Sequence, residues 1–187
     1  MKSAARQCIA VIGLGRSGQG DDGIGSAVIR ALRADFRPRT DVRLIDADLS
    51  EIEVELLLAE TCGVVMVGLV QTQGPPGAFK VLRGAAILPI ARSLAVSAHS
   101  ATVLAPLARQ ELLEAVPAEA VLIAINGTQT RNADTLTPAM HMALGPAVLA
   151  VELELARMGR PLSRLPRAHA FRDPWIRRPT RTELCGH

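Results

Sequence analysis

The chain has 187 residues, and 21 Lys and Arg side chains against 18 Asp and Glu give it a formal net charge of +3. Hydrophobic residues make up 49% and charged residues 21%, a balance typical of a folded domain, so disorder as the main state is excluded. Aromatic residues make up only 2%, which leaves few rings for stacking on bases. We therefore expect no nucleic-acid partner.

The chain carries three cysteines, Cys8, Cys62 and Cys185, which lie far apart and include no Cys-x-x-Cys pair. This spacing favours neither a disulfide framework nor a zinc ribbon, and a reducing cytoplasm is the simpler location. The apolar run over residues 8–14 is too short to cross a bilayer and leads into a glycine-rich turn. We expect no signal peptide, no transmembrane helix and no membrane partner.

The first third of the chain alternates between strand and helix patterns. A short apolar run over residues 8–15 predicts a first and central strand, buried on both faces of a parallel sheet. Apolar residues then recur at helical spacing over residues 24–32, and residues 42–46 predict a second strand. A capping box formed by Ser50 and Glu53 opens a second helix.

The same alternation continues beyond residue 60. Residues 63–70 predict a third buried strand. After the turn Gly74-Pro-Pro-Gly77, residues 78–82 predict a strand beside the third one, which this local return would make antiparallel. Residues 100–116 are typical of a helix, and residues 121–125 predict a further buried strand.

A last helix begins with Thr137 as its N-cap and Pro138 at its first position, and runs to about Met158. We expect one α/β domain over residues 1–158, followed by an Arg- and Pro-rich extension over residues 159–187. Alternating strands and helices predict a three-layer α/β/α sandwich, with a mostly parallel twisted sheet of about five strands.

The turn Gly13-Leu-Gly-Arg-Ser-Gly18 follows the first strand and matches Gly-x-Gly-x-x-Gly, the signature of dinucleotide binding. Such a site needs the helix to begin at the third glycine, so that free N–H groups face the pyrophosphate. Here the helix begins later, and Asp21 and Asp22 stand at its start. Two carboxylates repel a pyrophosphate and favour a cation, although plain N-capping by one acid is an alternative explanation.

The run from Gly13 to Gly25 resembles the opening motif of the hydrogenase maturation proteases, the endopeptidases that trim the C-terminus of the nickel–iron hydrogenase large subunit. That motif reads Gly-x-Gly-Asn, then a short stretch, then Asp-Asp/Glu-Gly-x-Gly. The resemblance covers about residues 8–158, and the shared order of its motifs carries more weight than any one of them. Four later segments are similar to family motifs: Leu44-Ile45-Asp46, Gly74-Pro-Pro-Gly77, Ser97-Ala-His99 and Leu136-Thr-Pro138.

The resemblance implies a nickel-sensing site built from three side chains. In the family these are the second acid of the pair, an Asp at the end of the third strand, and the His; the matching positions here are Asp22, Gly68 and His99. The middle ligand is therefore missing. The loop residues that we assign to this site, besides Asp22, are Gly13, Gly15, Asp21, Gly23 and Gly25.

Two more departures lie close to this site. Arg16 replaces the Asn of the first turn, and Ala47-Asp48-Leu49 stands where the family has Gly-Gly-Thr. Asp46 or Asp48 could compensate for the missing ligand, because open α/β sheets place their sites at the carboxyl ends of the strands. One imidazole and one carboxylate alone leave most positions of a divalent ion to water or substrate.

The resemblance implies a cytoplasmic endopeptidase of the aspartic type that removes the C-terminal extension of the nickel-loaded large-subunit precursor. Nickel would arrive with the substrate, and Asp22 or His99 would activate the attacking water. Two alternatives stay open: a catalytically degenerate homologue that binds the precursor like a chaperone, for which Gly68 is the reason, and a dinucleotide-binding oxidoreductase. We expect a monomer that meets its partner transiently.

Overall fold

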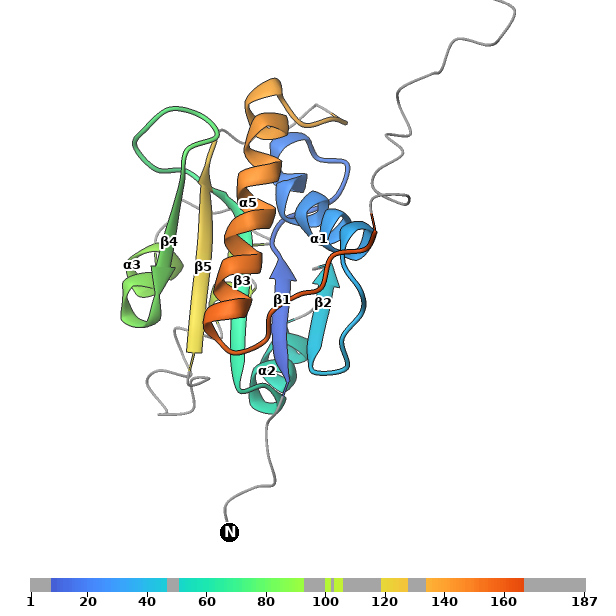
Figure 1. Cartoon of the computed structure of the whole chain (residues 1–187). Coiled ribbons are helices and arrows are strands. Elements are labelled where there is room, and N and C mark those ends of the chain that lie inside the picture. Colours follow the sequence, from blue (N-terminus) through green and yellow to red (C-terminus); the bar gives the residue numbers. More distant parts are fainter. Residues whose placement is uncertain are drawn as a thin grey trace, which may run out of the picture.

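The computed structural model describes residues 8–46, 51–92, 100–101, 103–105, 119–127 and 134–166. A five-stranded sheet forms the middle layer, with its strands in the order β2-β1-β3-β5-β4 (Figure 1). Four strands are parallel and the last one is antiparallel at the edge of the sheet. Their bounds are β1 (Ile9–Gly13), β2 (Val42–Asp46), β3 (Gly63–Val70), β4 (Phe79–Arg83) and β5 (Glu119–Asn126).

Continuous apolar runs form the inner strands of this sheet. Every residue of β1 and of β3 is buried, as expected for strands that are covered on both faces. The outer strand β2 is fully buried only at Val42. The predicted strands are confirmed, and β1 lies inside the sheet, but the middle position belongs to β3.

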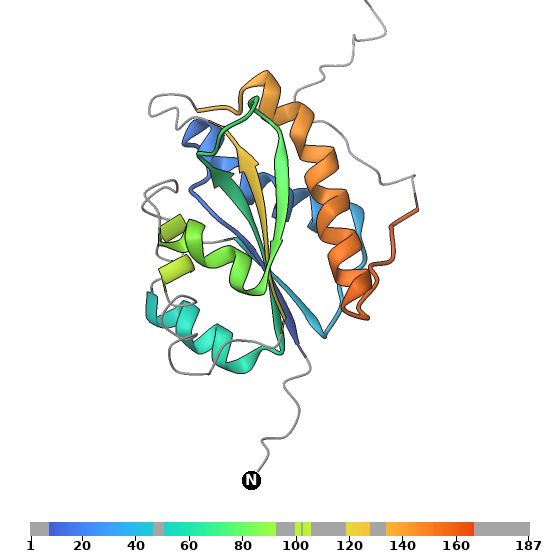
Figure 2. The ribbon, with the colours of Figure 1, turned by 90° about the vertical axis from the view of Figure 1, so that its left-hand side faces the viewer.

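Helices cover both faces, so the predicted three-layer sandwich is confirmed (Figure 2). On one face, α1 (Ile24–Asp35) and α5 (Pro138–Arg157) pack on the sheet and on each other. The other face carries α2 (Glu51–Glu60), α3 (Leu88–Ala91) and the helical residues 103–105. Ser50 and most of the helix predicted over residues 100–116 lie outside the described residues.

The prediction that β4 lies beside β3 is wrong. β5 lies between them, and β4 pairs with β5 in an antiparallel register that sets Val81 opposite Ile123. β5 pairs with all eight residues of β3 and is buried from its second residue on, so it suits an inner position. β4 is only five residues long and carries Lys80 and Arg83, which is typical of an edge strand.

Among the described helices, α5 is the one that is long and apolar enough to cross a membrane. Of its most apolar stretch of 18 residues, 44% is buried. Core helices pass the same test. Here Val148, Val151 and Leu155 pack into the core on the sheet, and the helix begins and ends within one residue of its prediction. This packing is that of a core helix.

After α5 the chain crosses to the C-terminal end of α1 (Figure 1). The backbone N–H of Arg37 donates to the carbonyl of Ser163 at 2.9 Å, and that of Leu165 donates to the carbonyl of Asp35 at 2.7 Å. Leu162 packs against the core cluster that α1 and α5 share. Residues 159–166 thus pack against the domain, whereas residues 167–187 lie outside the described residues.

Candidate functional site

The carboxyl ends of the parallel strands meet at one edge of the sheet. β1 ends there at Gly13, which is paired with Asp46 of β2 on one side and Val67 of β3 on the other. The chain then forms the glycine-rich turn and a short 3₁₀ helix, η1 (Gly20–Gly23), before α1 begins. The acid pair lies in η1, so the sheet edge and the acids form one region.

The site-loop glycines allow this turn to pack tightly. A Cβ at Gly13 would lie 2.6 Å from the carbonyl oxygen of Gly25, so α1 rests directly on the end of β1. Gly15 has a φ of 89°, and a Cβ there would lie 2.0 Å from the carbonyl oxygen of Asp22. Gly23 leaves more room, with 3.3 Å to its nearest neighbour. The predicted glycines therefore hold Asp22 over the turn.

Asp22 is 6% exposed and lies in η1, just before α1. Its Oδ2 accepts a hydrogen bond from the backbone N–H of Arg16 at 3.1 Å. Its Oδ1 is buried and has no hydrogen-bond partner among the residues that the structure places. A bare buried carboxylate oxygen costs free energy, which a cation or a donor on a bound substrate would recover. Asp22 is therefore the strongest candidate for contact with a substrate.

Asp21 has a different, structural contact. It is 2% exposed, and it accepts hydrogen bonds from the backbone N–H of Thr137 at 2.7 Å and from its hydroxyl at 3.1 Å. Thr137 is the N-cap residue of α5, as predicted, but its hydroxyl donates to Asp21 and does not cap its own helix. Neither η1 nor α1 has a side-chain cap, so the N-capping explanation for the acid pair is wrong.

The space beside Gly68, the position that the resemblance gives for a third-strand ligand, is filled by another side chain. Gly68 is buried in β3, and a Cβ there would lie 2.5 Å from the Cβ of Leu14. Leu14 is fully buried and packs in the core cluster that covers the α2 face of the sheet. The sequence gives no signal that Leu14 takes this space, because the two residues meet only in the folded sheet.

Asp46 is half-buried at the same edge, and its Oδ1 accepts a hydrogen bond from the hydroxyl of Ser26 in the first turn of α1. Its part as a compensating ligand stays a prediction. Asp48 and His99 lie outside the described residues. Within the parts of the chain that are described, no group of three or more His, Cys, Asp and Glu side chains is placed to hold a metal ion.

The dinucleotide alternative does not fit this geometry. α1 begins at Ile24, and η1 with its two buried acids separates it from Gly18. A pyrophosphate at the start of α1 would meet these carboxylates in place of free N–H groups. The turn is therefore unsuited to a dinucleotide.

Asn126, at the end of β5, is a structural residue of this edge that the sequence analysis missed. It is 7% exposed, its Oδ1 accepts from the backbone N–H of Thr72 at 2.9 Å, and its Nδ2 donates to the carbonyl of Gly74 at 2.7 Å. Its backbone carbonyl accepts from the N–H of Gly77 at 2.8 Å. The sequence signal is faint: one polar residue that closes an apolar strand.

Comparisons with known proteins agree with this architecture. The family model described as hydrogenase maturation protease matches residues 26–154. The hydrogenase maturating endopeptidase HybD from E. coli is similar in structure, with a TM-score of 0.74 and 19% identity over 86% of this chain and 98% of that one. A second endopeptidase from Escherichia coli gives a TM-score of 0.75 and 20% identity over the same shares.

An archaeal structure is also similar, the hydrogenase 2 maturation peptidase from Thaumarchaeota archaeon SCGC_AB-539-E09. It has a TM-score of 0.58 and 23% identity over 81% of this chain and 98% of that one. No curated protein matches the sequence. At these identities the solved structures show the shared fold, and the family model places the chain among its relatives.

Proposed function

Since the chain belongs to the hydrogenase maturation protease family, we propose that it is the endopeptidase that removes the C-terminal extension of a nickel-loaded [NiFe]-hydrogenase large-subunit precursor. The observation that carries this proposal is the buried Oδ1 of Asp22 at the carboxyl edge of the sheet, which has no hydrogen-bond partner among the described residues. Open α/β sheets place their sites at this edge, and an unpartnered buried acid there supports a chemical role. The proposed setting is the cytoplasm, in a transient complex with the precursor.

Asp22 is the proposed catalytic residue. Its side chain would take a proton from the attacking water or contact the nickel that the precursor carries. His99 is proposed as its partner, and Asp46 or Asp48 as an accessory acid. Nickel is part of the substrate in this proposal. A protease that offers few ligands of its own to the nickel suits this reaction, because the cleaved large subunit keeps its nickel and must leave the site easily.

Asp21 is proposed as a positioning residue. It joins η1 to the first residue before α5, and Asp22 is its direct neighbour in η1. Loss of this contact would let η1 move and displace the Asp22 carboxylate from the sheet edge. Activity is sensitive to such displacement, since a shift of about 1 Å can cost ~100-fold in rate.

The test is a cleavage assay with a nickel-loaded precursor, in which intact mass reports the loss of the C-terminal peptide. We expect cleavage by the wild type and by Glu60→Gln, a matched control that removes an exposed acid on α2. We expect Asp22→Asn and His99→Ala to lower the rate at least about 100-fold, as is typical for a general base. No cleavage by the wild type would show that the proposed activity is wrong, and cleavage by Asp22→Asn at the wild-type rate would show that Asp22 is not the catalytic residue.

One structural observation favours a second candidate function, a degenerate homologue that binds the precursor without cutting it. Leu14 fills the space beside Gly68, so the position that the resemblance gives for a third-strand ligand has no room for a side chain. The same assay separates the two functions when precursor binding is followed by size-exclusion chromatography. A stable complex with no change of mass would support the binding factor.

A further inference from the structure

A cavity of about 200 Å³ opens beside the C-terminal half of α1, between that helix, β2 and the segment that follows α5. Apolar and basic side chains share its lining. The apolar residues are Leu32, Phe36, Pro38, Val42, Leu44 and Leu162, and the basic residues are Arg33, Arg37 and Arg39. We use the name arginine-lined cavity for this set.

The arginine-lined cavity is separate from the candidate active site. Asp22 lies just before the N-terminus of α1, whereas Phe36 of the cavity follows its last residue, Asp35. A helix of 12 residues that rises about 1.5 Å per residue separates the two places by roughly 18 Å. A ligand in the cavity would therefore not touch Asp22.

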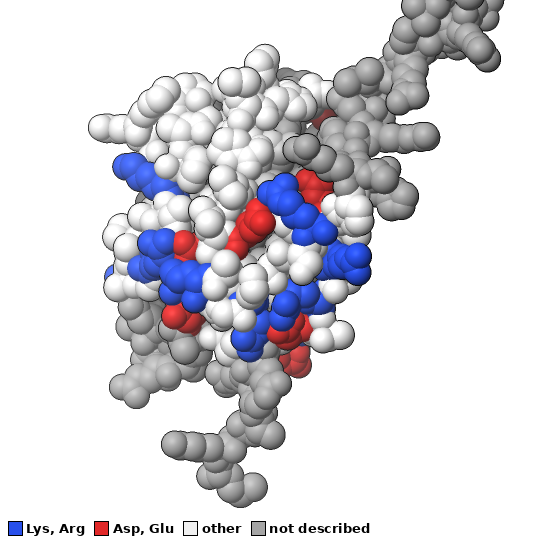
Figure 3. All heavy atoms as spheres, viewed as in Figure 1, with Lys and Arg blue, Asp and Glu red and all other residues white. Residues whose placement is uncertain are grey.

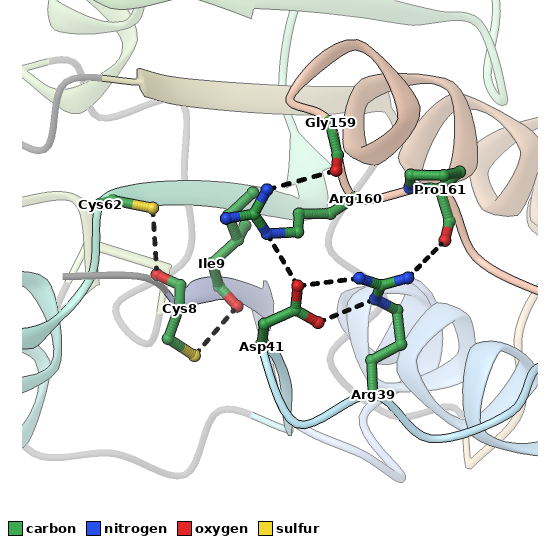
Figure 4. A network of polar contacts seen from close by, with 8 residues as sticks. All are labelled: Cys8, Ile9, Arg39, Asp41, Cys62, Gly159, Arg160 and Pro161. Atoms are coloured by element: carbon green, nitrogen blue, oxygen red, sulfur yellow. Dashed lines mark hydrogen bonds and ion pairs between the residues drawn. The ribbon is translucent and has the colours of Figure 1, made fainter. Parts of the chain in front are cut away.

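Arg39 is fixed by an ion-pair network beside the cavity. Its Nε and one Nη donate to the two oxygens of Asp41 at 2.8 Å, and Arg160 also reaches Asp41 at 2.8 Å (Figure 4). The remaining Nη of Arg39 donates to the carbonyl of Pro161 at 3.1 Å. This network holds the wall of the cavity in place. The Asp41 carboxylate pairs with two guanidinium groups, those of Arg39 and Arg160.

The other two arginines carry charge that no described carboxylate neutralises. Arg33 is exposed and donates to the neutral carbonyl of Leu44 at 2.8 Å. The guanidinium of the exposed Arg37 makes no hydrogen bond or ion pair to any residue that the structure places. Figure 3 shows basic side chains, with a few acidic ones among them, across the lower half of this face, while its upper part is almost uncharged. The cavity thus combines an apolar interior with uncompensated positive charge.

We propose that the arginine-lined cavity binds a segment of a partner protein that presents one large apolar side chain between acidic residues. The volume is below that of a pocket for a drug-sized ligand and suits one aliphatic or aromatic side chain. Exposed guanidinium groups pair with carboxylates, in bidentate geometry where possible. Charge complementarity therefore selects an acidic segment, and the apolar interior selects its anchor residue.

The segments over residues 1–7 and 167–187 have the wrong charge for this cavity. Residues 167–187 contain five arginines and two acidic residues, and residues 1–7 contain Lys2, Arg6 and no acid. Both segments would bring positive charge to Arg33 and Arg37. The occupant we propose is therefore another molecule.

The test uses an acetylated peptide amide, Glu-Glu-Leu-Glu-Glu, titrated into the full-length protein with labelled methyl groups. We expect saturable NMR shifts of the methyls of Val42, Leu44 and Leu162, and weaker binding at higher salt. Changing the central Leu of the peptide to Ala should weaken binding at least about tenfold, because the buried apolar area is lost. Arg37→Glu should weaken it at least about fivefold, and Lys80→Glu on β4 should leave it unchanged.

Several results would overturn the proposal. Equal affinity for the Ala peptide would show that the cavity is not used, and equal weakening by Lys80→Glu would show a response to net charge alone. A dimer of the full chain that Arg37→Glu separates would identify a second copy as the occupant. Arg33→Gln is the second variant in case Arg37→Glu disturbs the fold. Cleavage is not measured, so this test is independent of the proposed function.

Discussion

Asp21 and Thr137 are 116 residues apart in the chain, and two hydrogen bonds join them at the carboxyl edge of the sheet. One bond comes from a backbone N–H and the other from a hydroxyl. The contact closes the glycine-rich turn onto the start of α5, so the last helix of the domain holds the first loop in place. The neighbouring residue, Asp22, has one carboxylate oxygen without a hydrogen-bond partner among the described residues.

This contact predicts unequal costs for its two partners. Thr137→Val removes the hydroxyl donor and should lower the free energy of unfolding by about 1 kcal/mol. Asp21→Ala also leaves the backbone N–H of Thr137 without its acceptor and should cost about 2–3 kcal/mol. Urea unfolding measures both values. A double variant whose cost equals the sum of the single costs would show that the two residues are not coupled.

Gly68 and Gly145 predict opposite effects of the same substitution. Gly68→Ala forces a Cβ to within 2.5 Å of the Leu14 Cβ in a packed core, and it should lower the free energy of unfolding by about 1–3 kcal/mol. Gly145 lies exposed in α5, where an added Cβ would have no neighbour within 4 Å, so Gly145→Ala should raise stability by about 0.5–1 kcal/mol. Thermal unfolding of the two variants compares them directly. Equal shifts of the melting temperature would contradict the packing described for Leu14.

Asn126→Asp should loosen the loop over residues 71–78. The substitution replaces the Nδ2 donor with an oxygen that faces the carbonyls of Gly74 and Pro75, which accept from Nδ2 at 2.7 and 3.2 Å. We expect a loss of about 2–3 kcal/mol in stability and faster hydrogen exchange at the amide of Thr72. Gln71→Glu, which adds the same charge at an exposed neighbouring position, is the control and should cost less than about 0.5 kcal/mol.

Glu154 predicts a pH dependence of stability. Its hydrogen bonds with Arg83 lower the pKa of this buried carboxyl below its usual value, although burial opposes the shift and Arg157 adds to it. Because the folded pKa is the lower one, the unfolded chain binds more protons as the solution is acidified. The stabilisation by the Glu154 ion pairs is therefore complete when the pH is above the pKa that this carboxyl has in the unfolded chain. It is lost as the pH falls through the lower pKa that the carboxyl has in the folded protein.

Glu154→Gln should lower the free energy of unfolding by about 1–2 kcal/mol at pH 7, an amount reduced by the exposure of Arg83. The difference from the wild type should shrink as the pH falls below about 4. Urea unfolding from pH 7 to pH 3 measures this convergence. Glu60→Gln breaks only the exposed ion pair with Arg43, so its free energy of unfolding should be almost the same as that of the wild type at both pH 7 and pH 3. If the difference in the free energy of unfolding between the wild type and Glu154→Gln stays constant with pH, the ionised Glu154 carboxylate is not the cause of that difference.

Most of the fold was predictable because local patterns and packing agree. The apolar runs of β1 and β3 are long enough to be buried on both faces, and the spacing of α1 and the Thr137-Pro138 start of α5 give clear helix signals. Strand order was less predictable, since the turn before β4 suggests a hairpin and carries no information about β5. Pairing between β4 and β5 depends on a strand that comes much later in the sequence.

The site was predictable in its members and less so in their roles. The acid pair and its glycines stand together in the sequence, and the structure keeps them together. The division of roles between Asp21 and Asp22 depends on Thr137, and the closed space beside Gly68 depends on Leu14. Such contacts join distant segments or depend on side-chain volume across a sheet, and no local pattern encodes them.

The insertion of β5 between β3 and β4 sets an order of events during synthesis. The 35 residues that separate Arg83 from Glu119 take about 2–7 s to add at roughly 5–20 residues per second. Until β5 emerges from the ribosome, the edge of β3 that will pair with β5 is open, and β4 is the nearest finished strand along the chain. A hairpin of β3 and β4 would not be the native pairing, because β5 separates them in the folded sheet. The nascent chain must therefore either delay the pairing of β4 or exchange it when β5 arrives.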